Sequence, residues 1–241
     1  MASPSRSRPA AYPVGADLPL DTIAYGPDAP TESELRLLGD LAGKRILQLG
    51  VHDGHTTVAL ARRGARVVAI EPSAAHLDAA RWRFEHDGVA VEVHHGDLAD
   101  LASVRADSID AALSIHTLGR VDDLARVFRQ VHRVLRPESP LVLSLPHPAF
   151  ALVDPWSDEP LRVRRSYWDP TPRSWAADGH EGVERARTIA ELFTLLSRAN
   201  FRVDTLLEPE PAAQGPRSEF WTDTMRWVPA TLVVRARKQG I

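Results

Sequence analysis

The stretch that decides the fold runs over residues 45–73 and reads RILQLGVHDGHTTVALARRGARVVAIEPS. Its first apolar run ends in a loop that contains Gly50 and Gly54. A helical segment follows, and a second apolar run ends on the acid Glu71. Such a βαβ unit cradles a nucleotide, because its glycines let backbone N–H groups approach a ligand and its acid can bind both ribose hydroxyls. The stretch therefore predicts a ligand of the adenosine type.

Apolar and helical segments go on alternating along the rest of the chain. The pattern predicts strands at 45–49, 66–70, 89–93, 110–114, 141–145, 201–207 and 231–236. It predicts helices at 31–41, 55–63, 73–86, 121–135 and 188–199, and capping boxes open the first and the last of them. Strands that alternate with helices through short links predict an α/β fold with a mostly parallel sheet.

Residues 146–186 break this pattern. They are rich in Pro, Trp, Arg and Asp and have no clear periodicity. A segment of this length inside a compact domain is either functional or disordered, and its five aromatic residues argue against disorder. We therefore predict a lid at 146–186 within a domain at 21–241. The Pro-, Ser- and Ala-rich residues 1–20 are predicted to form a disordered tail.

Composition excludes several classes of function. A net charge of −3 is unfavourable for binding nucleic acid. The absence of cysteine excludes disulfides, thiolate catalysis and thiolate metal sites. No stretch approaches the ~20 apolar residues that a membrane span needs, and no apolar core of a secretory signal follows the basic start. We predict a soluble cytoplasmic protein with neither nucleic acid nor membrane as partner. The sequence leaves its oligomeric state open.

The order of these features resembles the class I methyltransferases that depend on S-adenosylmethionine (SAM), over residues 22–238. The first motif of that family is an acid, one residue, and three glycines at alternate positions; residues 48–54 here read QLGVHDG. The outer glycines are kept, but Gln48 replaces the acid and His52 replaces the middle glycine. The resemblance implies SAM as cofactor. It also implies a Rossmann-like seven-stranded sheet with helices on both faces, which ends in an antiparallel hairpin.

The resemblance also implies roles for the residues that match the family. Gly50 would bring backbone N–H groups to the methionine and ribose part of SAM, and Glu71 would accept hydrogen bonds from the ribose hydroxyls. Asp97 would accept a hydrogen bond from the adenine amino group. The alternative for Asp97 is that it caps the N-terminus of a helix. Leu98 would add a backbone contact and apolar cover, and Ser114 would line the sulfonium and substrate side. The implied cofactor set is Tyr25, Gln48, Gly50, Gly54, Glu71, Asp97, Leu98 and Ser114.

A closer likeness is to a bacterial branch of small-molecule methyltransferases. The matching segments are Tyr25-Gly26, Ser144-Leu145-Pro146-His147-Pro148, Tyr167-Trp168, Arg187-Thr188 and Glu208-Pro209. In that branch an aromatic residue of the leading segment can cover the cofactor, which is the role implied for Tyr25. The likeness implies a small-molecule acceptor that is methylated on oxygen or nitrogen. The tryptophans of the lid could wall a pocket for a flat or apolar acceptor, or they could pack the lid onto the sheet.

Methyl transfer from a sulfonium gains most from positioning, but a base helps when the acceptor is a hydroxyl or a protonated amine. His116 and His147 follow the fourth and fifth strands. Ligands of open α/β sheets lie beyond the carboxyl ends of the strands, so these two histidines are the predicted catalytic residues. An alternative for His147 is a local hydrogen bond that orders its loop. For His180 and Asp169 a solvated loop position is favoured.

Two other functions fit the same βαβ unit. An NAD-dependent oxidoreductase would share the unit and the ribose acid, but it requires G-x-G-x-x-G, and His52 and His55 stand where glycines are needed. A non-catalytic SAM- or nucleotide-binding protein is favoured by the departures at Gln48 and His52. No metal site is predicted, because His52 lies in the loop and the adjacent His94 and His95 face opposite sides of a strand.

Overall fold

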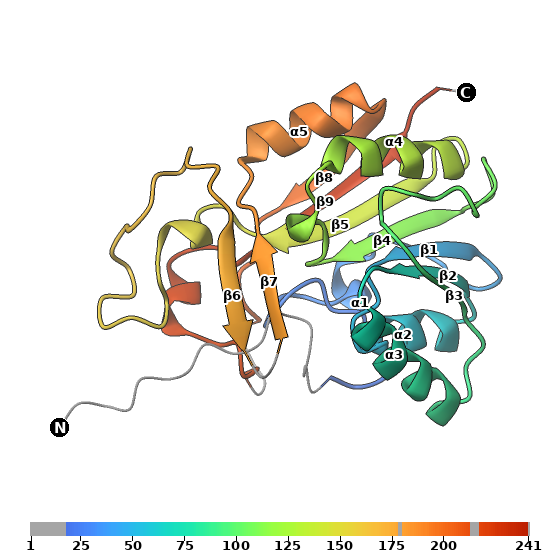
Figure 1. The fold of residues 1–241 in the computed structure, drawn as a ribbon, viewed down its shortest axis with the longest axis horizontal. Helices are drawn as coiled ribbons and strands as arrows, with labels where there is room; N and C mark the ends of the chain where they lie inside the picture. Colours follow the sequence, from blue (N-terminus) through green and yellow to red (C-terminus); the bar gives the residue numbers. More distant parts are fainter. Residues whose placement is uncertain (1–17, 178–179, 213–216, 241) are drawn as a thin grey trace.

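The computed structural model of the protein describes residues 18–177, 180–212 and 217–240, with the backbone alone for residues 175–177 and 180–182. A seven-stranded sheet runs through the molecule, and helices pack on both of its faces (Figure 1). A separate two-stranded hairpin stands at the edge where the parallel strands end (Figure 1). The tail predicted at 1–20 lies outside the described residues up to residue 17.

The large sheet has the strand order β3-β2-β1-β4-β5-β9-β8. Its strands are β1 (Arg45–Leu49), β2 (Arg66–Glu71), β3 (Glu92–His95), β4 (Ala111–Ile115), β5 (Pro140–Pro146), β8 (Phe201–Leu207) and β9 (Thr231–Lys238). Neighbours pair in parallel from β3 to β5, whereas β9 runs antiparallel to both β5 and β8. The mostly parallel sheet and its antiparallel terminal hairpin are therefore confirmed.

The helices form one layer on each face of the sheet (Figure 1). One layer holds α1 (Glu32–Leu35), α2 (His55–Arg62) and α3 (Ala74–His86), and the other holds α4 (Leu124–Val134) and α5 (Ile189–Arg198). Side chains of β1 alternate between the two cores: Leu47 and Leu49 pack with α4 and α5, and Ile46 packs with α2. Because helices cover both faces, the central strands are mostly apolar and buried, with Gln48, Ser114 and Ser144 as buried polar residues among them.

The leading helix is shorter than predicted. It ends at Leu35 instead of Leu41, and Arg36 adopts a left-handed conformation with φ of 51°. The buried carboxylate of Glu32 accepts hydrogen bonds from the backbone N–H groups of residues 37–39. Those N–H groups would otherwise need the carbonyls of a continuing helix, so the side chain of Glu32 replaces one turn of helix.

The lid contains regular structure that the sequence does not predict. Strands β6 (Arg173–Ala177) and β7 (His180–Glu184) pair as an antiparallel hairpin. The helical turns η1 (Leu118–Arg120), η2 (Phe150–Leu152) and η3 (Asp223–Arg226) complete the connections. The hairpin escapes prediction because its sequences, RSWAA and HEGVE, contain one β-branched residue and no apolar alternation.

The bonds of Glu32 predict a stability change. Its Oε2 also accepts a hydrogen bond from the hydroxyl of the fully buried Tyr25. We expect Glu32→Gln to lower the free energy of unfolding by about 2 kcal/mol in urea titrations, because an amide N–H₂ then faces donors that require an acceptor. Glu34→Gln, at an exposed cap of the same helix, should cost about 0.5 kcal/mol. Equal losses in the two variants would contradict this account.

Candidate active site

The acid that ends β2 holds the glycine loop. Glu71 Oε2 accepts hydrogen bonds from the N–H groups of Val51 at 2.7 Å and His52 at 3.1 Å, and Oε1 accepts from Ser73 at 2.9 Å. Burial raises the pKa of Glu71, but hydrogen bonds from His76, Ser73 and Val51 outweigh burial and lower this pKa to about 2. Glu71 is therefore a carboxylate at neutral pH, fixed at the carboxyl edge of the sheet.

The loop itself turns at two glycines with positive φ, Gly50 at 80° and Gly54 at 87°. A Cβ atom on Gly50 would lie 2.2 Å from Thr117 Oγ1, so only glycine permits this close approach. Gln48 donates from Nε2 to the carbonyl of Gly50 at 3.1 Å and accepts from the hydroxyl of Thr57 at 2.9 Å. Where the family has an acid, Gln48 therefore ties the loop to α2 through neutral hydrogen bonds.

The imidazole of His52 bridges the loops that follow β1 and β4. Its Nε2 lies 2.8 Å from Thr117 Oγ1, and the Thr117 hydroxyl donates to the carbonyl of Ile115. His52 Nε2 therefore carries the proton, and the buried Nδ1 makes no hydrogen bond to a residue that the structure describes. Burial lowers the pKa of His52 to about 3, and the charge on Arg120 lowers it further. The ring is neutral and fills the gap between the two loops.

His116 lies under the leading segment. Its Nε2 is 3.3 Å from Thr231 Oγ1, and a Cβ atom on Gly26 would lie 3.0 Å from the same nitrogen. Burial lowers the pKa of His116 to about 3, with a further contribution from the charge on Arg120. The predicted base is therefore neutral and sits beyond β4, as expected from the sequence.

His147 uses both ring nitrogens to fix its surroundings. Nδ1 accepts a hydrogen bond from the N–H of Ala149 at 3.0 Å, so Nε2 carries the proton and donates to Glu208 Oε1 at 2.8 Å. These bonds tie the loop after β5 to the segment after β8. The arrangement favours the loop-ordering alternative for His147 over the catalytic one.

Tyr25 and Ser114 pack inside the protein. Tyr25 is fully buried in the core on the α2 side. Ser114 is also fully buried, and its hydroxyl donates to the carbonyl of Leu49 at 3.1 Å. Here Tyr25 stabilises the leading segment and Ser114 joins β4 to β1.

Asp97 and Leu98 follow β3. Asp97 Oδ1 accepts a hydrogen bond from the N–H of Ala99 at 2.9 Å within a turn. The helix N-cap alternative for Asp97 is wrong, because no helix follows it. The side chain of Leu98 is 1% exposed and packs in the core with α4. Because its side chain is buried in the core, only the backbone of Leu98 is free to make the implied contact with adenine.

These residues fit SAM at its ribose and adenine ends. Glu71 and the Gly50 loop meet at the carboxyl edge of β1 and β2, and the Asp97 turn follows the neighbouring β3. At the position of the family's middle glycine, His52 closes the gap toward Thr117, and its Nδ1 is an orphaned buried acceptor. The set therefore offers a charged acceptor and a closely approaching backbone for the ribose of the cofactor, with an imidazole in place of the family's middle glycine.

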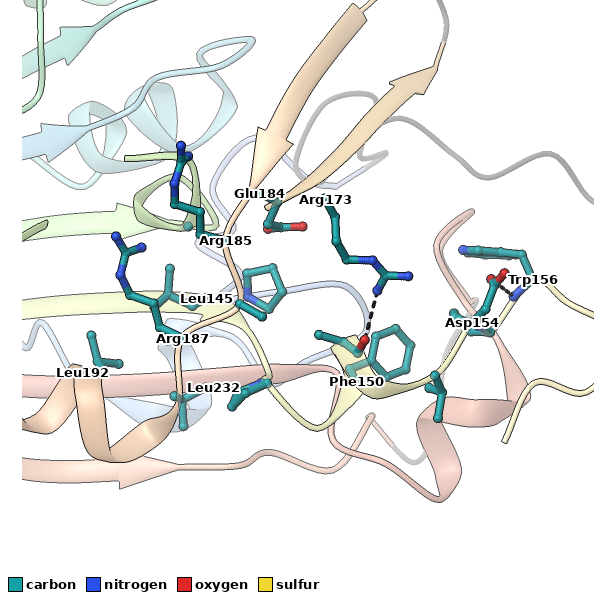
Figure 2. Close-up of a pocket in the computed structure, with 17 residues that line it drawn as sticks. Leu145, Phe150, Asp154, Trp156, Arg173, Glu184, Arg185, Arg187, Leu192 and Leu232 are labelled. Atoms are coloured by element: carbon teal, nitrogen blue, oxygen red, sulfur yellow. Dashed lines mark hydrogen bonds between the residues drawn. The ribbon is translucent and has the colours of Figure 1, made fainter. Parts of the chain in front are cut away.

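The Glu71 carboxylate, the Gly50 loop and the Asp97 turn together form the cofactor half-site. A pocket lies beside it, between the lid, the end of β5 and α5 (Figure 2). Phe150, Trp156, Leu145 and Leu192 are among its apolar walls. Arg173 enters it from the hairpin and donates to the carbonyl of Ala151 at 3.0 Å, as Figure 2 shows. Of the lid tryptophans expected to wall a pocket or to pack the lid onto the sheet, Trp156 lines this pocket, whereas Trp168 is 80% exposed and does neither. The side chain of Trp175 lies outside the described part of the structure.

One backbone bond and the side chain of Arg187, which follows the lid, hold the end of the lid against the loop after β4. The N–H of Arg185 donates to the carbonyl of Gly119 at 2.9 Å. Arg187 Nη2 donates to the carbonyls of Val121 at 2.9 Å and Asp122 at 3.0 Å. Because η1 follows directly after β4, these bonds place the pocket at the carboxyl edge of the sheet, which is where ligands of α/β folds bind.

The described residues contain neither a metal cluster nor a membrane helix. No three His, Asp or Glu side chains among them could hold a metal ion. None of their helices is long and apolar enough to cross a membrane.

Comparison with known proteins supports the resemblance to methyltransferases. The family model of a methyltransferase domain matches residues 47–143, less than half of the chain, from within β1 to within β5 and including the glycine loop, Glu71 and the Asp97 turn. Over these residues the chain is similar to the class I SAM-dependent methyltransferases. SAM is the cofactor of this class, in agreement with the adenosine-type ligand that the glycine loop predicts.

Curated proteins and solved structures are similar to the chain over different lengths. A ubiquinone biosynthesis O-methyltransferase from Hahella chejuensis is 36% identical over 104 residues, which are 43% of this chain and 44% of that protein. The chain thus matches less than half the length of that curated relative. A candidate SAM-dependent methyltransferase from Listeria monocytogenes has a TM-score of 0.70 at 23% identity, over 87% of this chain and 96% of that one. The [4+2]-cyclase SpnF has a TM-score of 0.62 at 17% identity, over 86% and 79%. The two structures show the shared fold.

Proposed function

We propose that this methyltransferase moves a methyl group from SAM to an oxygen or nitrogen atom of a small molecule, with oxygen favoured by the name of the Hahella relative. The observation that carries the proposal is Glu71, an ionised carboxylate fixed beside the glycine loop at the end of β2. A charged acceptor strengthens hydrogen bonds to ribose hydroxyls. The apolar pocket under the lid offers a place for the acceptor next to this half-site.

The residues of the chain act mainly by positioning. Bound SAM supplies a methyl group that is already activated on a sulfonium, so alignment of the acceptor provides much of the rate. Glu71 binds the ribose hydroxyls, and Gly50 lets the loop backbone come close. Arg185 and Arg187 hold the lid on the loop after β4, which keeps water from the reacting atoms.

A calorimetric titration with SAM and with its demethylated product tests the cofactor half of the proposal. A second step incubates the protein with methyl-labelled SAM and fractions of small-molecule extract. We expect both compounds to bind and the label to appear on a small molecule. If SAM does not bind to the folded protein, the proposed function is wrong.

A non-catalytic binding protein is the second candidate. The contact between His52 and Thr117 favours it, because this contact closes the gap that the cofactor must enter. SpnF has a similar fold and is a [4+2]-cyclase, so this architecture also serves functions other than methyl transfer. Tight SAM binding without label transfer to any fraction would support this candidate.

The proposal extends to the organisation of the chain. Residues 21–241 act as one methyltransferase domain with the lid at 146–186. The protein acts in the cytoplasm on a small molecule, and neither nucleic acid nor membrane is a partner.

A further inference from the structure

The pocket under the lid has one charged wall and one apolar wall. Leu145 and Leu232 lie on the sheet side, and Phe150 and Trp156 lie on the lid side. Glu184, the last residue of β7, brings a carboxylate into this lining. Figure 2 shows Glu184 and Arg173 reaching from the ends of the two hairpin strands toward the space above Phe150. Asp154, Arg173, Arg185 and Arg187 complete the polar part of the lining. A compound with an apolar body and a polar end that can donate a hydrogen bond to Glu184 fits these walls.

The β6–β7 hairpin and the close approach of Gly119 fix the position of Glu184. It is the cross-strand partner of Arg173 in the β6–β7 register. A Cβ atom on Gly119 would lie 3.3 Å from Glu184 Oε1, so the carboxylate rests against the backbone of η1. The hydrogen bond from Arg185 to Gly119 fixes the end of β7 there. The carboxylate therefore lies at the first turn after β4, on the cofactor side of the pocket.

The turn against which Glu184 rests also contacts the glycine loop. Thr117 precedes η1, and its Oγ1 lies 2.8 Å from His52 Nε2 in the glycine loop. Two residues further on, Gly119 lies against the Glu184 carboxylate. Burial lowers the pKa of Arg120, which ends this turn, while the charges of Glu184 and Glu71 both raise it. One turn of chain therefore lies between the Glu184 carboxylate and the glycine loop, which is the arrangement that a group transfer requires.

We propose that Glu184 accepts the proton of the acceptor hydroxyl, and that the acceptor is an aromatic or similarly apolar compound that presents this hydroxyl to Glu184. The inference rests on the proposed methyl transfer. In the step, the hydroxyl oxygen forms the new bond to the methyl carbon, and the electron pair of the breaking C–S bond goes to sulfur. The hydroxyl proton passes to Glu184 and from there to water.

The two predicted histidine bases are less suited to this step. Both ring nitrogens of His147 are engaged by Ala149 and Glu208. The Nε2 of His116 lies next to Thr231 and under Gly26 of the leading segment. Neither residue lines the pocket, whereas Glu184 does.

Binding of two probes without cofactor tests the inference independently of catalysis. The probes are 2-naphthol and 2-methoxynaphthalene, which differ in whether the oxygen can donate a hydrogen bond. We expect calorimetry to show the protein binding 2-naphthol about tenfold more tightly, because a hydrogen bond to a carboxylate is worth roughly this factor. Glu184→Leu should bring the two affinities together.

Glu159→Gln is the matched control, since Glu159 is an exposed lid carboxylate outside the pocket lining. It should keep the tenfold preference for 2-naphthol. Persistence of the preference in Glu184→Leu, with circular dichroism showing the variant folded, would overturn the role of Glu184. Failure of both probes to bind the wild-type protein would overturn the pocket assignment. A preference for 2-naphthol in a protein that does not bind SAM would refute methyl transfer and leave the pocket assignment standing.

Turnover gives a second readout once an acceptor is found. Glu184→Gln should lower kcat about 100-fold, in the range typical for loss of a general base, and should leave the dissociation constant for SAM unchanged. Equal losses in kcat and in SAM affinity would show that Glu184 acts only through the structure of the lid.

Discussion

Glu71→Gln is expected to weaken SAM binding about 100-fold in calorimetric titrations, which corresponds to about 2.7 kcal/mol. The carboxylate offers the ribose hydroxyls a charged acceptor, whereas a glutamine offers one neutral acceptor and a competing donor. The variant also loses part of the bonds that hold the glycine loop to the end of β2. The substitution should therefore weaken SAM binding and loosen the attachment of the glycine loop at the same time.

The matched control for this prediction is Glu92→Gln. Glu92 lies on the neighbouring strand β3 and pairs with Arg45 and His94 at the surface. Its replacement should leave the affinity for SAM within about twofold of the wild type, because surface ion pairs contribute little. A comparable loss in both variants would mean that overall charge governs binding and that Glu71 does not contact the cofactor.

The low pKa of Glu71 also predicts that the free energy of unfolding of Glu71→Gln depends less on pH in the acid range than that of the wild type. Because the pKa of Glu71 is about 2 in the folded protein and 4.5 for an ordinary glutamate, Glu71 stabilises the fold above pH 4.5, and this contribution is lost as the pH falls toward 2. The shift corresponds to about 3 kcal/mol. Urea titrations across this pH range should show a steeper loss of stability in the wild type than in Glu71→Gln. Parallel curves would contradict the assigned pKa.

The sequence predicts the parts of this protein that depend on neighbouring residues. The order of strands and helices follows from local patterns, and the observed strand order confirms it. The capping box at Thr31 and Glu34 is present, whereas at Thr188 only the N-cap bond from the Glu191 N–H forms. The sequence also identifies Gln48 and His52 as departures from the family motif. What the sequence cannot show is the consequence of His52, because its partner Thr117 lies 65 residues further along the chain.

The lid illustrates the same limit. Glu184 has no motif around it, and it matters only because the hairpin folds back onto η1. The segments that resemble the small-molecule branch also form long-range contacts in the structure. His147 bonds to Glu208 across 61 residues, and Arg187 bonds to the carbonyl of Val121 across 66. These residues hold the lid and its neighbouring loops in place, which single-sequence patterns do not reveal.

His52→Gly is expected to tighten SAM binding about tenfold, measured by calorimetry. The wild-type ring must leave its hydrogen bond with Thr117 before the cofactor can enter, and a buried hydrogen bond of this kind contributes about 1 kcal/mol. Glycine also accepts the positive φ of this position, 53°, without the strain that histidine carries. The substitution therefore removes the obstacle and keeps the backbone that the loop requires.

Thr117→Val separates the two contributions of His52. Valine keeps the shape of threonine and removes the hydroxyl that His52 Nε2 donates to. If the hydrogen bond holds the ring in the gap, Thr117→Val should tighten binding severalfold, and adding it to His52→Gly should change little, since the two variants then act on one contact. Fully additive effects would assign the gain to the space that glycine opens. Weaker binding in His52→Gly would mean that the imidazole contacts SAM directly, and the buried Nδ1 would then be its point of contact.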